Sequence, residues 1–489
     1  MMGVKLVVSA LGAVAIAGQV FADFAQATVA RKSPDWFTKG VMVQIQPRAF
    51  TAEGTLKAAE KRLKYLKDSG FTIVYLVPVF KMDADMDQTF WSPRQIKSGF
   101  GNPKNQYRMA DYNHVDEEYG TDQDLKDFCA KAHELGLYVI FDLVYLHCGP
   151  TAPFLKEHPE FTYWNDDGTV KKGPWRFPKL NFQQEGLRKF LLANMRNLLL
   201  QFGCDGFRCD VGDGIPIDFW CEAHDMTDAV TAGHAIMLCE GSCSVNQQKG
   251  FDADYGWFPC EVWKKDGTFD AGVIRRRWEG NVSTRPAGAR YVNHYENHDI
   301  ATDHRPRREL ALGHEAVDQI NVWMLTADGI PMLFNGNEFA EASPDHSMFG
   351  KTPLDWAALE TPAGKYRHEL VRRLSDLRRM HPAFTSAQGR PGMTWFNTSR
   401  PDEVTAFARR GGGETMFVVQ NWTPGELEVT VDFNVPKSEK VSYIVVEEPD
   451  RSLRGVFAAQ PLLERRAEKT GNDSFRLGAY GFAVFEVKE

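Results

Sequence analysis

The sequence predicts an α/β protein: a closed (β/α)8 TIM barrel with a short insertion after its third strand, followed by an all-β sandwich domain. Short apolar runs alternate with amphipathic helical stretches from about residue 40 to residue 385, as parallel strands buried on both faces require. Eight such runs occur, and an eightfold repeat favours a closed barrel over an open sheet. Beyond residue 390 the strands alternate in polarity between Gly and Asn turns, which is typical of a sandwich.

The eight barrel strands are expected in a regular order along the chain. Amphipathic stretches at 54–69, 121–136 and 185–202 supply helices between them. The run at 251–257 is the least regular of the strands. The predicted strands are 41–46 (VMVQIQ), 72–78 (TIVYLVP), 138–144 (YVIFDLV), 205–210 (DGFRCD), 235–240 (AIMLCE), 251–257 (FDADYGW), 290–299 (RYVNHYENHD) and 329–338 (GIPMLFNGNE).

The stretch after the third strand is too long for a plain connection. It is rich in Pro, Gly, Trp and charge, and we expect it to form a small subdomain over the active-site face. The predicted organisation is a signal peptide at 1–22, the first part of the barrel at 35–147, the inserted subdomain at 148–184, the rest of the barrel at 185–385 and the sandwich at 390–489.

The first 22 residues read as a cleaved secretory signal. Lys5 precedes an apolar run, and small residues stand near Ala22, where a signal peptidase would cut. The alternatives are a short buried helix or a membrane anchor, but the run is shorter than the roughly 20 residues that a bilayer requires. We therefore predict an exported protein, periplasmic or extracellular, without stable membrane insertion.

Composition limits the kinds of partner. The 489 residues are 43% hydrophobic and 25% charged, with a formal charge of -8, so the chain is long enough for two or three folded domains. Lys and Arg are scattered along the chain, whereas nucleic-acid-binding proteins gather them on one face. We expect no nucleic-acid partner and favour a neutral or weakly polar ligand. The oligomeric state is not predicted.

Charged side chains gather at the carboxyl ends of four predicted strands. Asp142 lies near the end of the third strand, Arg208 and Asp210 end the fourth, Glu240 ends the fifth, and His298 with Asp299 end the seventh. Barrel chemistry collects at this rim. One such residue alone could cap a helix or open a loop, but capping does not explain acids or histidines on four strands.

Paired carboxylates on such a rim suit cleavage of a glycosidic bond. One ionised carboxylate attacks the anomeric carbon while a protonated partner donates to the leaving oxygen. Arg208 lies two residues before Asp210, so both side chains point the same way. We expect Arg208 to lower the pKa of Asp210 and keep it ionised.

Seven segments then carry a family resemblance, each in the family's order. DLVYLH (142–147) resembles DxVxNH, GFRCD (206–210) resembles GFRxD, and YENHD (295–299) resembles the NHD segment. The others are VMVQIQPRAF (41–50), QYRMADYNHVDEEYGT (106–121), LCEG (238–241) and GIPMLFNGNE (329–338). From about residue 40 to its end, the chain resembles the α-amylase superfamily of retaining glycoside hydrolases.

The resemblance implies roles for seven residues. Asp210 would be the nucleophile, Glu240 the general acid/base and Asp299 the carboxylate that stabilises the transition state. Tyr107 would stack on the sugar at the cleaved bond, while His147, Arg208 and His298 would bind its hydroxyls or hold the carboxylates. The implied reaction is double displacement with retention on a maltodextrin-like oligosaccharide or polysaccharide α-glucan.

Two other functions stay open on the same scaffold. A transglycosylase or isomerase acting on sucrose, trehalose or maltooligosaccharides differs only in whether water or a sugar intercepts the glycosyl-enzyme. A non-catalytic carbohydrate-binding homologue would have lost carboxylates, whereas this chain keeps all three.

Two departures from the family pattern and one further resemblance bear on metal and specificity. The usual asparagine ligand of a structural calcium is replaced by Leu146, which cannot coordinate a hard cation, so we predict no certain cofactor and no metal ligand. Residues 211–214 (VGDG) replace the Lys-His pair that contacts sugars on the leaving-group side, so long-chain starch is not assured. FPKLN (177–181) resembles the MPKLN segment of neopullulanase and cyclodextrin-degrading members, which favours shorter or branched glucans.

The cysteines are expected to be structural. Cys209 and Cys239 each precede a rim carboxylate by one residue, so strand alternation turns them outward into the helix layer. A thiol nucleophile needs exposure and a nearby positive charge. The eight cysteines could form up to four disulfides, and the sequence does not choose among the pairings.

Overall fold

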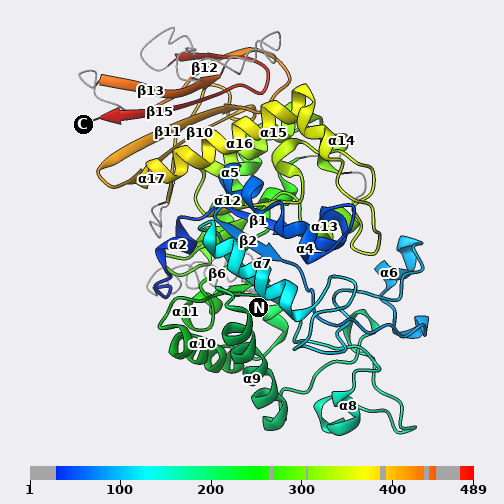
Figure 1. Ribbon diagram of the computed structural model, residues 1–489. Helices are drawn as coiled ribbons and strands as arrows, with labels where there is room; N and C mark the ends of the chain where they lie inside the picture. Colours follow the sequence, from blue (N-terminus) through cyan, green and yellow to red (C-terminus); the bar gives the residue numbers. More distant parts are fainter. Residues whose placement is uncertain are drawn as a thin grey trace, which may run out of the picture.

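The computed structural model has a closed barrel of eight parallel strands at its centre (Figure 1). It describes residues 29–263, 268–303, 307–385, 393–433, 440–447 and 474–488, so the expected signal at 1–22 lies outside the described residues. Strand β1 pairs with both β2 and β8, which closes the barrel and confirms the predicted fold. The strands are β1 (Met42–Ile45), β2 (Ile73–Leu76), β3 (Tyr138–Leu143), β4 (Gly206–Cys209), β5 (Ile236–Cys239), β6 (Ala253–Gly256), β7 (Tyr291–Asn293) and β8 (Ile330–Phe334).

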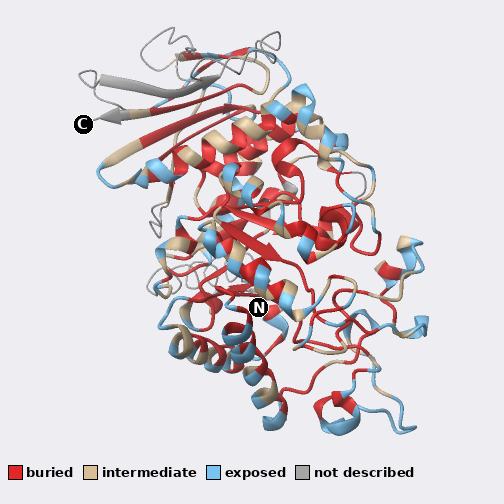
Figure 2. Ribbon diagram, viewed as in Figure 1, coloured by how far each residue is buried: buried red, intermediate tan, exposed pale blue. Residues whose placement is uncertain are grey.

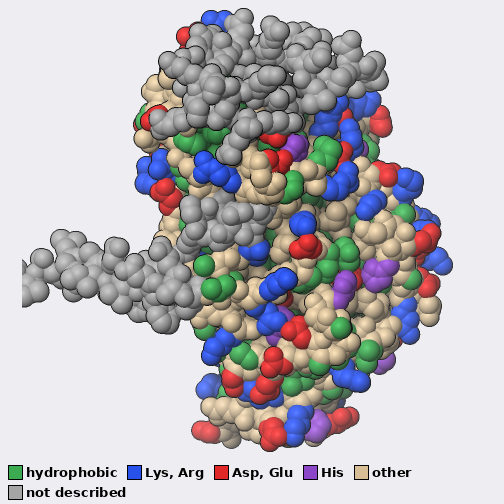
Figure 3. Space-filling view, turned by 90° about the vertical axis from the view of Figure 1, so that its left-hand side faces the viewer, with side chains coloured by type: hydrophobic (Ala, Val, Ile, Leu, Met, Phe, Trp, Pro, Cys, Tyr) green, Lys and Arg blue, Asp and Glu red, His purple; other side chains and the backbone are tan. Residues whose placement is uncertain are grey.

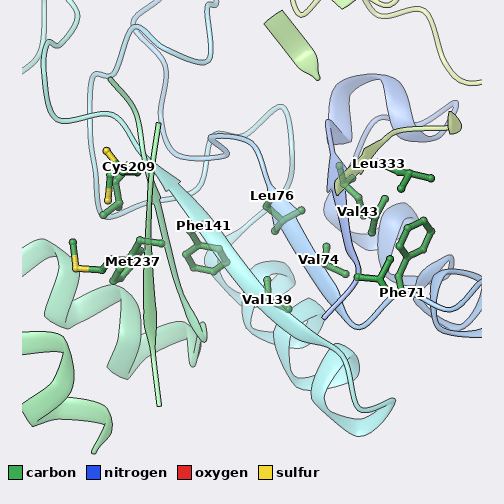
Figure 4. Close-up of a cluster of buried hydrophobic side chains, with 14 of the residues drawn as sticks. Val43, Phe71, Val74, Leu76, Val139, Phe141, Cys209, Met237 and Leu333 are labelled. Atoms are coloured by element: carbon green, nitrogen blue, oxygen red, sulfur yellow. The ribbon is translucent and has the colours of Figure 1, made fainter. Parts of the chain in front are cut away.

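Alternation along the strands creates two apolar layers. Met42, Ile73 and Ile140 belong to the cluster that fills the barrel interior, while Val43 and Phe141 belong to the layer between strands and helices. Figure 4 shows members of this outer layer, with Cys209 and Met237 on one side and Val74, Leu76 and Leu333 farther round. Most strand residues are therefore apolar on both faces, and buried polar side chains such as Gln44 and Arg208 interrupt this pattern.

Helices surround the barrel, and Figure 2 shows exposed residues along one side of them and buried residues along the other. Thr121 and Asp124 form a capping box that starts α7, and the left-handed Gly203 (φ 70) ends α9. The helix expected at 54–69 is two helices, α4 and α5. The helices up to β6 are α2 (Asp35–Thr38), α3 (Pro47–Phe50), α4 (Leu56–Glu60), α5 (Leu63–Asp68), α6 (Pro93–Ser98), α7 (Asp122–Glu134), α8 (Phe154–Glu157), α9 (Glu185–Phe202), α10 (Ile217–Thr231) and α11 (Asn246–Lys249). Those that follow are α12 (Ala271–Ser283), α13 (His298–Asp303), α14 (Arg308–Leu312), α15 (His314–Thr326), α16 (Pro362–Met380) and α17 (Pro382–Thr385).

The seventh strand is shorter than predicted. It ends at Asn293, and His298 begins helix α13 instead of ending the strand. The side chain of Asn297 accepts a hydrogen bond from the backbone N–H of Ile300 at 2.9 Å, as a helix-capping residue does. His298 and Asp299 are thus placed by the first turn of a helix and not by the alternation of a strand.

Two excursions meet at the carboxyl ends of the strands. One follows β2 and carries α6; the other follows β3 and carries α8. Lys172 of the second lies over the ring of Phe90 of the first, 4.9 Å from its centroid. Figure 1 shows both excursions extending from the barrel on the same side. They form the walls of the site described below.

The C-terminal domain consists of two antiparallel sheets, which confirms the predicted sandwich. Val404, Phe417, Leu427 and Phe475 come from both sheets and share one apolar core. The last two strands of this domain, 474–477 and 482–488, are joined by a turn at 478–481. The sheets are β13 (Lys440–Glu447), β15 (Phe482–Lys488), β11 (Glu414–Asn421), β10 (Val404–Gly411) and β9 (Thr394–Trp395), and β12 (Leu427–Thr430) with β14 (Ser474–Leu477).

The described surface mixes charges of both signs. Figure 3 shows Lys and Arg side chains interspersed with Asp and Glu on the face it displays. Over the ranges that the structure describes, no helix has the length and apolar character needed to span a membrane. The same ranges hold no group of three or more His, Cys, Asp or Glu side chains placed to bind a metal ion.

Candidate active site

A pocket lies at the carboxyl ends of the barrel strands. Five of the seven predicted site residues line it: Tyr107, His147, Asp210, Glu240 and Asp299. The remaining wall comes from the two excursions, from the residue that follows Asp210 and from residues after β8. These further lining residues are Ser92, Arg94, Asn105, Trp175, Phe177, Val211, Met348 and Phe349.

Arg208 is the charged centre beneath this pocket. It lies within β4 and its side chain is fully buried. Its Nη1 donates to Asp210 Oδ1 at 2.9 Å and to Asp142 Oδ1 at 2.8 Å. The alternation of the strand places Arg208 and Asp210 on the same side, as the sequence indicated.

Glu240 follows β5 and shares the same arginine. Its Oε2 accepts a hydrogen bond from the backbone N–H of Val211 at 2.8 Å. Arg208 Nη2 also lies 2.8 Å from this oxygen, but the pair lacks hydrogen-bond geometry. Arg208 therefore forms close ion pairs with both Asp210 and Glu240.

Tyr107 and His298 form one hydrogen-bonded chain with Gln44. Gln44 accepts from the backbone N–H of His298 and donates from Nε2 to its Nδ1, both at 2.9 Å. His298 Nε2 can then donate to the Tyr107 hydroxyl at 2.6 Å, which donates to Asp142 Oδ2 at 2.9 Å. The rings of Tyr107 and His298 stack with centroids 5.2 Å apart. Burial lowers the pKa of His298, which fits a neutral ring in this chain.

His147 presents an acceptor nitrogen beside the pocket. Its Nε2 donates to the carbonyl oxygen of Tyr107 at 2.9 Å, while its buried Nδ1 has no hydrogen-bond partner in the described chain. Burial lowers the pKa of His147 to about 4, so the ring is neutral near pH 7. A buried acceptor of this kind is expected to be satisfied by a ligand or a water molecule. Trp175 and Phe177, from the inserted segment, lie next to its ring.

The three carboxyl groups titrate differently. Burial raises the pKa of Asp210 well above its ordinary range, and the charge of Glu240 adds to this, although Arg208 opposes it. The expectation that Arg208 gives Asp210 a lowered pKa is therefore wrong, because desolvation outweighs the ion pair. Burial likewise raises the pKa of Glu240. For Asp299, burial is outweighed by His298, Arg94 and Arg208, and its pKa falls to about 2.

A tight turn follows β4 and is hydrogen-bonded to the end of β5. In the segment 211–214, which we call the VGDG turn, Val211 has a left-handed backbone (φ 45, ψ 46), a strained conformation for a β-branched residue. The backbone N–H of Gly212 donates to the carbonyl oxygen of Glu240 at 3.0 Å. Asp213 accepts from the N–H of Ser242 at 2.7 Å and from Asn246 at 2.8 Å. The VGDG turn, which stands where the Lys-His pair is absent, thus holds Glu240 in place through hydrogen bonds from Val211 and Gly212.

The position associated with calcium in the family does not fit a cation here. Leu146 is buried among apolar side chains. A methyl group added at Gly214 would lie 3.3 Å from its side chain, so Leu146 packs against the VGDG turn. Its donor-free side chain cannot replace an asparagine oxygen.

The cysteines beside the site are buried thiols. Cys209 and Cys239 belong to the apolar layer outside the barrel, and burial raises the pKa of both well above the ordinary thiol value. Such thiols are poor nucleophiles, as predicted. Cys129, Cys148, Cys204, Cys221 and Cys243 are free thiols as well.

Sequence reasoning missed several residues that shape this site. Arg94 pairs with Asp299 and comes from a short helix with no recognisable motif. Gln44 was visible only as part of an apolar strand. Asp142 was placed at the rim without a role, and the structure shows its carboxylate bound by Tyr75, Tyr107 and Arg208. These contacts depend on which strands become neighbours, which a single sequence does not state.

Sequence comparisons with known proteins find similar chains among α-amylases and related enzymes. The family model "Alpha amylase, catalytic domain" matches residues 19–166. "Alpha-amylase MalA" of Haloarcula japonica is 25% identical over 410 residues, covering 80% of this chain and 56% of that protein. A cyclomaltodextrinase of Thermoanaerobacter pseudethanolicus is 24% identical over 368 residues, covering 63% and 58%. The chain thus spans a little over half the length of these curated relatives.

Solved structures share the complete fold. The maltogenic α-amylase AmyB of Thermotoga neapolitana superposes with a TM-score of 0.71 at 22% identity, covering 93% of this chain and 97% of that one. An Anoxybacillus α-amylase gives 0.73 at 16% identity, covering 94% and 99%. The family model and the shared fold support the resemblance of the ordered motifs to the α-amylase superfamily of glycoside hydrolases.

Proposed function

We propose that the protein is a retaining glycoside hydrolase that cleaves α-glucosidic bonds in maltodextrin-like or related α-glucans. The observation that carries this proposal is the convergence of Asp210, Glu240 and Asp299 on one pocket, with Arg208 between the first two. Retaining hydrolysis needs a nucleophilic carboxylate and a protonated carboxyl group together.

The contacts of Arg208 favour this division of protonation. Two buried carboxyl groups beside one guanidinium favour a state with a single proton between them. Arg208 lies 2.9 Å from Asp210 Oδ1 and 2.8 Å from Glu240 Oε2, so it stabilises one negative charge on this pair, and the family resemblance assigns that charge to Asp210. Glu240 Oε2 accepts from Val211, so the acidic proton would reside on Oε1.

In the first step, Asp210 would attack the anomeric carbon while the bond to the leaving oxygen breaks. Glu240 would give its proton to that oxygen and become a carboxylate. In the second step, Glu240 would take a proton from water, and the oxygen of that water would displace Asp210. Asp299, ionised at the pocket wall, would stabilise the positive charge on the ring in both steps.

The pocket also offers polar and aromatic contacts for a sugar ring. The unpartnered His147 Nδ1 would accept from a hydroxyl, and Tyr107 and Trp175 provide aromatic surface. The family resemblance supports a role for Tyr107 in stacking and for Arg208 and His298 in holding the carboxylates and hydroxyls. The substrate is proposed to be short or branched, since FPKLN (177–181) is present and the Lys-His pair is not.

Product profiling tests the proposal. The enzyme is incubated with maltotetraose, pullulan, cyclodextrin, sucrose and trehalose, and products are separated by chromatography. Shorter sugars from any α-glucan are expected, and longer products would identify the transglycosylase alternative. Asp210→Ala and Glu240→Gln should abolish turnover, while Asp218→Asn, at an exposed carboxylate on α10, should retain it. No change in any substrate, or normal turnover by Asp210→Ala, would refute the assignment.

We also propose that the protein is exported, on the strength of the charged, apolar and small-residue pattern of residues 1–22. The protein recovered from outside the cytoplasm should begin at Asp23 when its N-terminus is sequenced. A recovered chain that still carries residues 1–22 would contradict cleavage.

A further inference from the structure

One cation of the pocket wall has no place in the mechanism above. Arg94, on α6, donates from Nη1 to Asp299 and from Nη2 to Asp303 Oδ2, the latter at 2.7 Å. Asp299 and Asp303 are one turn apart on α13, so a single guanidinium spans both. The contact joins two segments that are 205 residues apart in the chain.

The helix that carries Arg94 is firmly built at both ends. Ser92 caps its start by accepting from the N–H of Gln95 at 3.1 Å, and Gly99, left-handed with φ 76, ends it. The Gln95 side chain donates to the carbonyl of Asn102 at 2.8 Å. Arg108, fully buried, donates to the carbonyls of Asp85 and Pro103 in the same excursion. The position of Arg94 is therefore set by the excursion and not by a flexible surface loop.

The pair is also part of the pocket and not of the outer surface. Arg94 and Asp299 both line the pocket, and their side chains are 32% and 24% exposed. An ion pair that lines the pocket can orient a carboxylate toward it, whereas an exposed surface pair contributes little to stability. The groups that face Asp299 are His298 and His294 beside it, Arg94 from α6, and Tyr107, Arg208, Asp210 and Glu240 from the floor of the site.

We propose that Arg94 is a positioning residue for Asp299. By binding Asp299 and Asp303 together, it fixes the first turn of α13 and holds the Asp299 carboxylate in one orientation toward the pocket. It thereby keeps this carboxylate ready for an oxocarbenium-like transition state before substrate arrives. The inference rests on the proposed glycosidase function.

The charge of Arg94 supports the same role. The charge of Asp299 raises the pKa of both Asp210 and Glu240, so the three carboxyl groups lie close enough to repel one another. Arg94 and Arg208 act against this repulsion, and the pKa of Asp299 stays at about 2. Without Arg94, the pKa of Asp299 should rise.

The test compares four variants on whichever α-glucan the wild-type enzyme cleaves. Arg94→Gln should lower kcat by about 10- to 100-fold with a small change in KM, because misplaced catalytic groups cost about that much. The acidic limb of its pH profile should move to higher pH. Arg94→Lys should restore part of kcat, and Asp303→Asn should give a smaller loss than Arg94→Gln. Lys97→Gln, an exposed residue on the same helix, should match the wild type.

Thermal unfolding of each variant separates positioning from folding. If Arg94→Gln unfolds at a lower temperature than the wild type, the comparison rests on Arg94→Lys and Asp303→Asn. Arg94→Lys keeps a cation at this position, and Asp303→Asn keeps the direct contact between Arg94 and Asp299. Wild-type kcat and an unchanged pH profile in a folded Arg94→Gln would overturn the inference. If the wild type and Lys97→Gln cleave no α-glucan at all, it is the proposed function that fails.

Discussion

Arg208 organises the site at the scale of single residues. It is fully buried and contacts Asp142, Asp210 and Glu240, so one cation offsets the mutual repulsion of three acids. Leaving such a cation without its partners is costly in a protein interior. The sequence predicted the pair with Asp210 from its spacing of two residues. It could not predict that burial would raise the pKa of Asp210, because desolvation depends on the surrounding packing.

Adding a single methyl group to the VGDG turn, by replacing Gly212 with Ala, should destabilise the protein. A Cβ at Gly212 would lie 2.4 Å from Cys239 Sγ, whereas a Cβ at Gly280, exposed within α12, would meet no atom within 4 Å. Gly212→Ala should therefore lower the free energy of unfolding by about 1–3 kcal/mol through overpacking. Gly280→Ala, the matched control, should raise it by about 0.5–1 kcal/mol. Urea unfolding measures both.

The same pair of variants tests the support of Glu240. Because the turn holds Glu240 through Val211 and Gly212, Gly212→Ala should also reduce kcat, while Gly280→Ala should not. Equal stability and equal kcat in the two variants would contradict the proposed packing of the turn.

Elements differ in how far the sequence determines them. The strands carrying Asp142, Asp210 and Glu240 were predictable because continuous apolar runs mark buried parallel strands. The sequence assigned Asp299 to the end of a strand, but it lies in α13. In the run RYVNHYENHD, nothing distinguishes Asn297, which caps this helix, from a residue of a strand. Arg94 escaped prediction because α6 belongs to an excursion whose path is set by tertiary contacts.

The junction of α7 with β4 should depend on pH. His133 Nε2 and His234 Nε2 each lie 2.8 Å from Asp205, which precedes β4. The hydrogen bond to Asp205 raises the pKa of His133 above its ordinary 6.5. A histidine whose pKa is higher in the folded protein than in the unfolded chain stabilises the folded state. This contribution is complete at pH values below the pKa of the unfolded chain and is lost as the pH rises through the pKa of the folded protein.

Replacing His133 by Gln should reveal this dependence. The stability difference between wild type and His133→Gln should be largest near pH 5.5 and should shrink toward pH 8.5, as urea unfolding at several pH values would show. A difference that is constant over this range, or one that grows with pH, would contradict the ion pair.

At the scale of the whole molecule, the barrel and the sandwich share a buried polar contact. Gln319 of α15 donates from Nε2 to the carbonyls of Asn421 at 2.8 Å and Gly481 at 3.1 Å. Gln420 in turn donates to the carbonyl of Gln319 at 3.1 Å. The two domain types were predictable from their strand patterns, but this contact was not, because it depends on how the domains pack.

Gln319→Leu should destabilise the protein as a unit. The substitution removes the Nε2 group that donates to the carbonyls of Asn421 and Gly481, and it leaves both carbonyls buried without that donor. The free energy of unfolding should therefore fall by at least about 2 kcal/mol. Arg379→Ala, which breaks an exposed pair on α16, should cost less than about 0.5 kcal/mol. Calorimetry that finds the two variants equal would contradict a tight interface.

The central claim is that Asp210 attacks the sugar, and covalent trapping tests it most directly. A fluorinated α-glucosyl fluoride forms the glycosyl-enzyme but slows its hydrolysis, so the adduct accumulates. Mass spectrometry of the digested enzyme should place one sugar on the peptide that contains Asp210, and Asp210→Ala should gain none. A sugar on a different residue, or no adduct in an enzyme that cleaves maltotetraose, would contradict the claim.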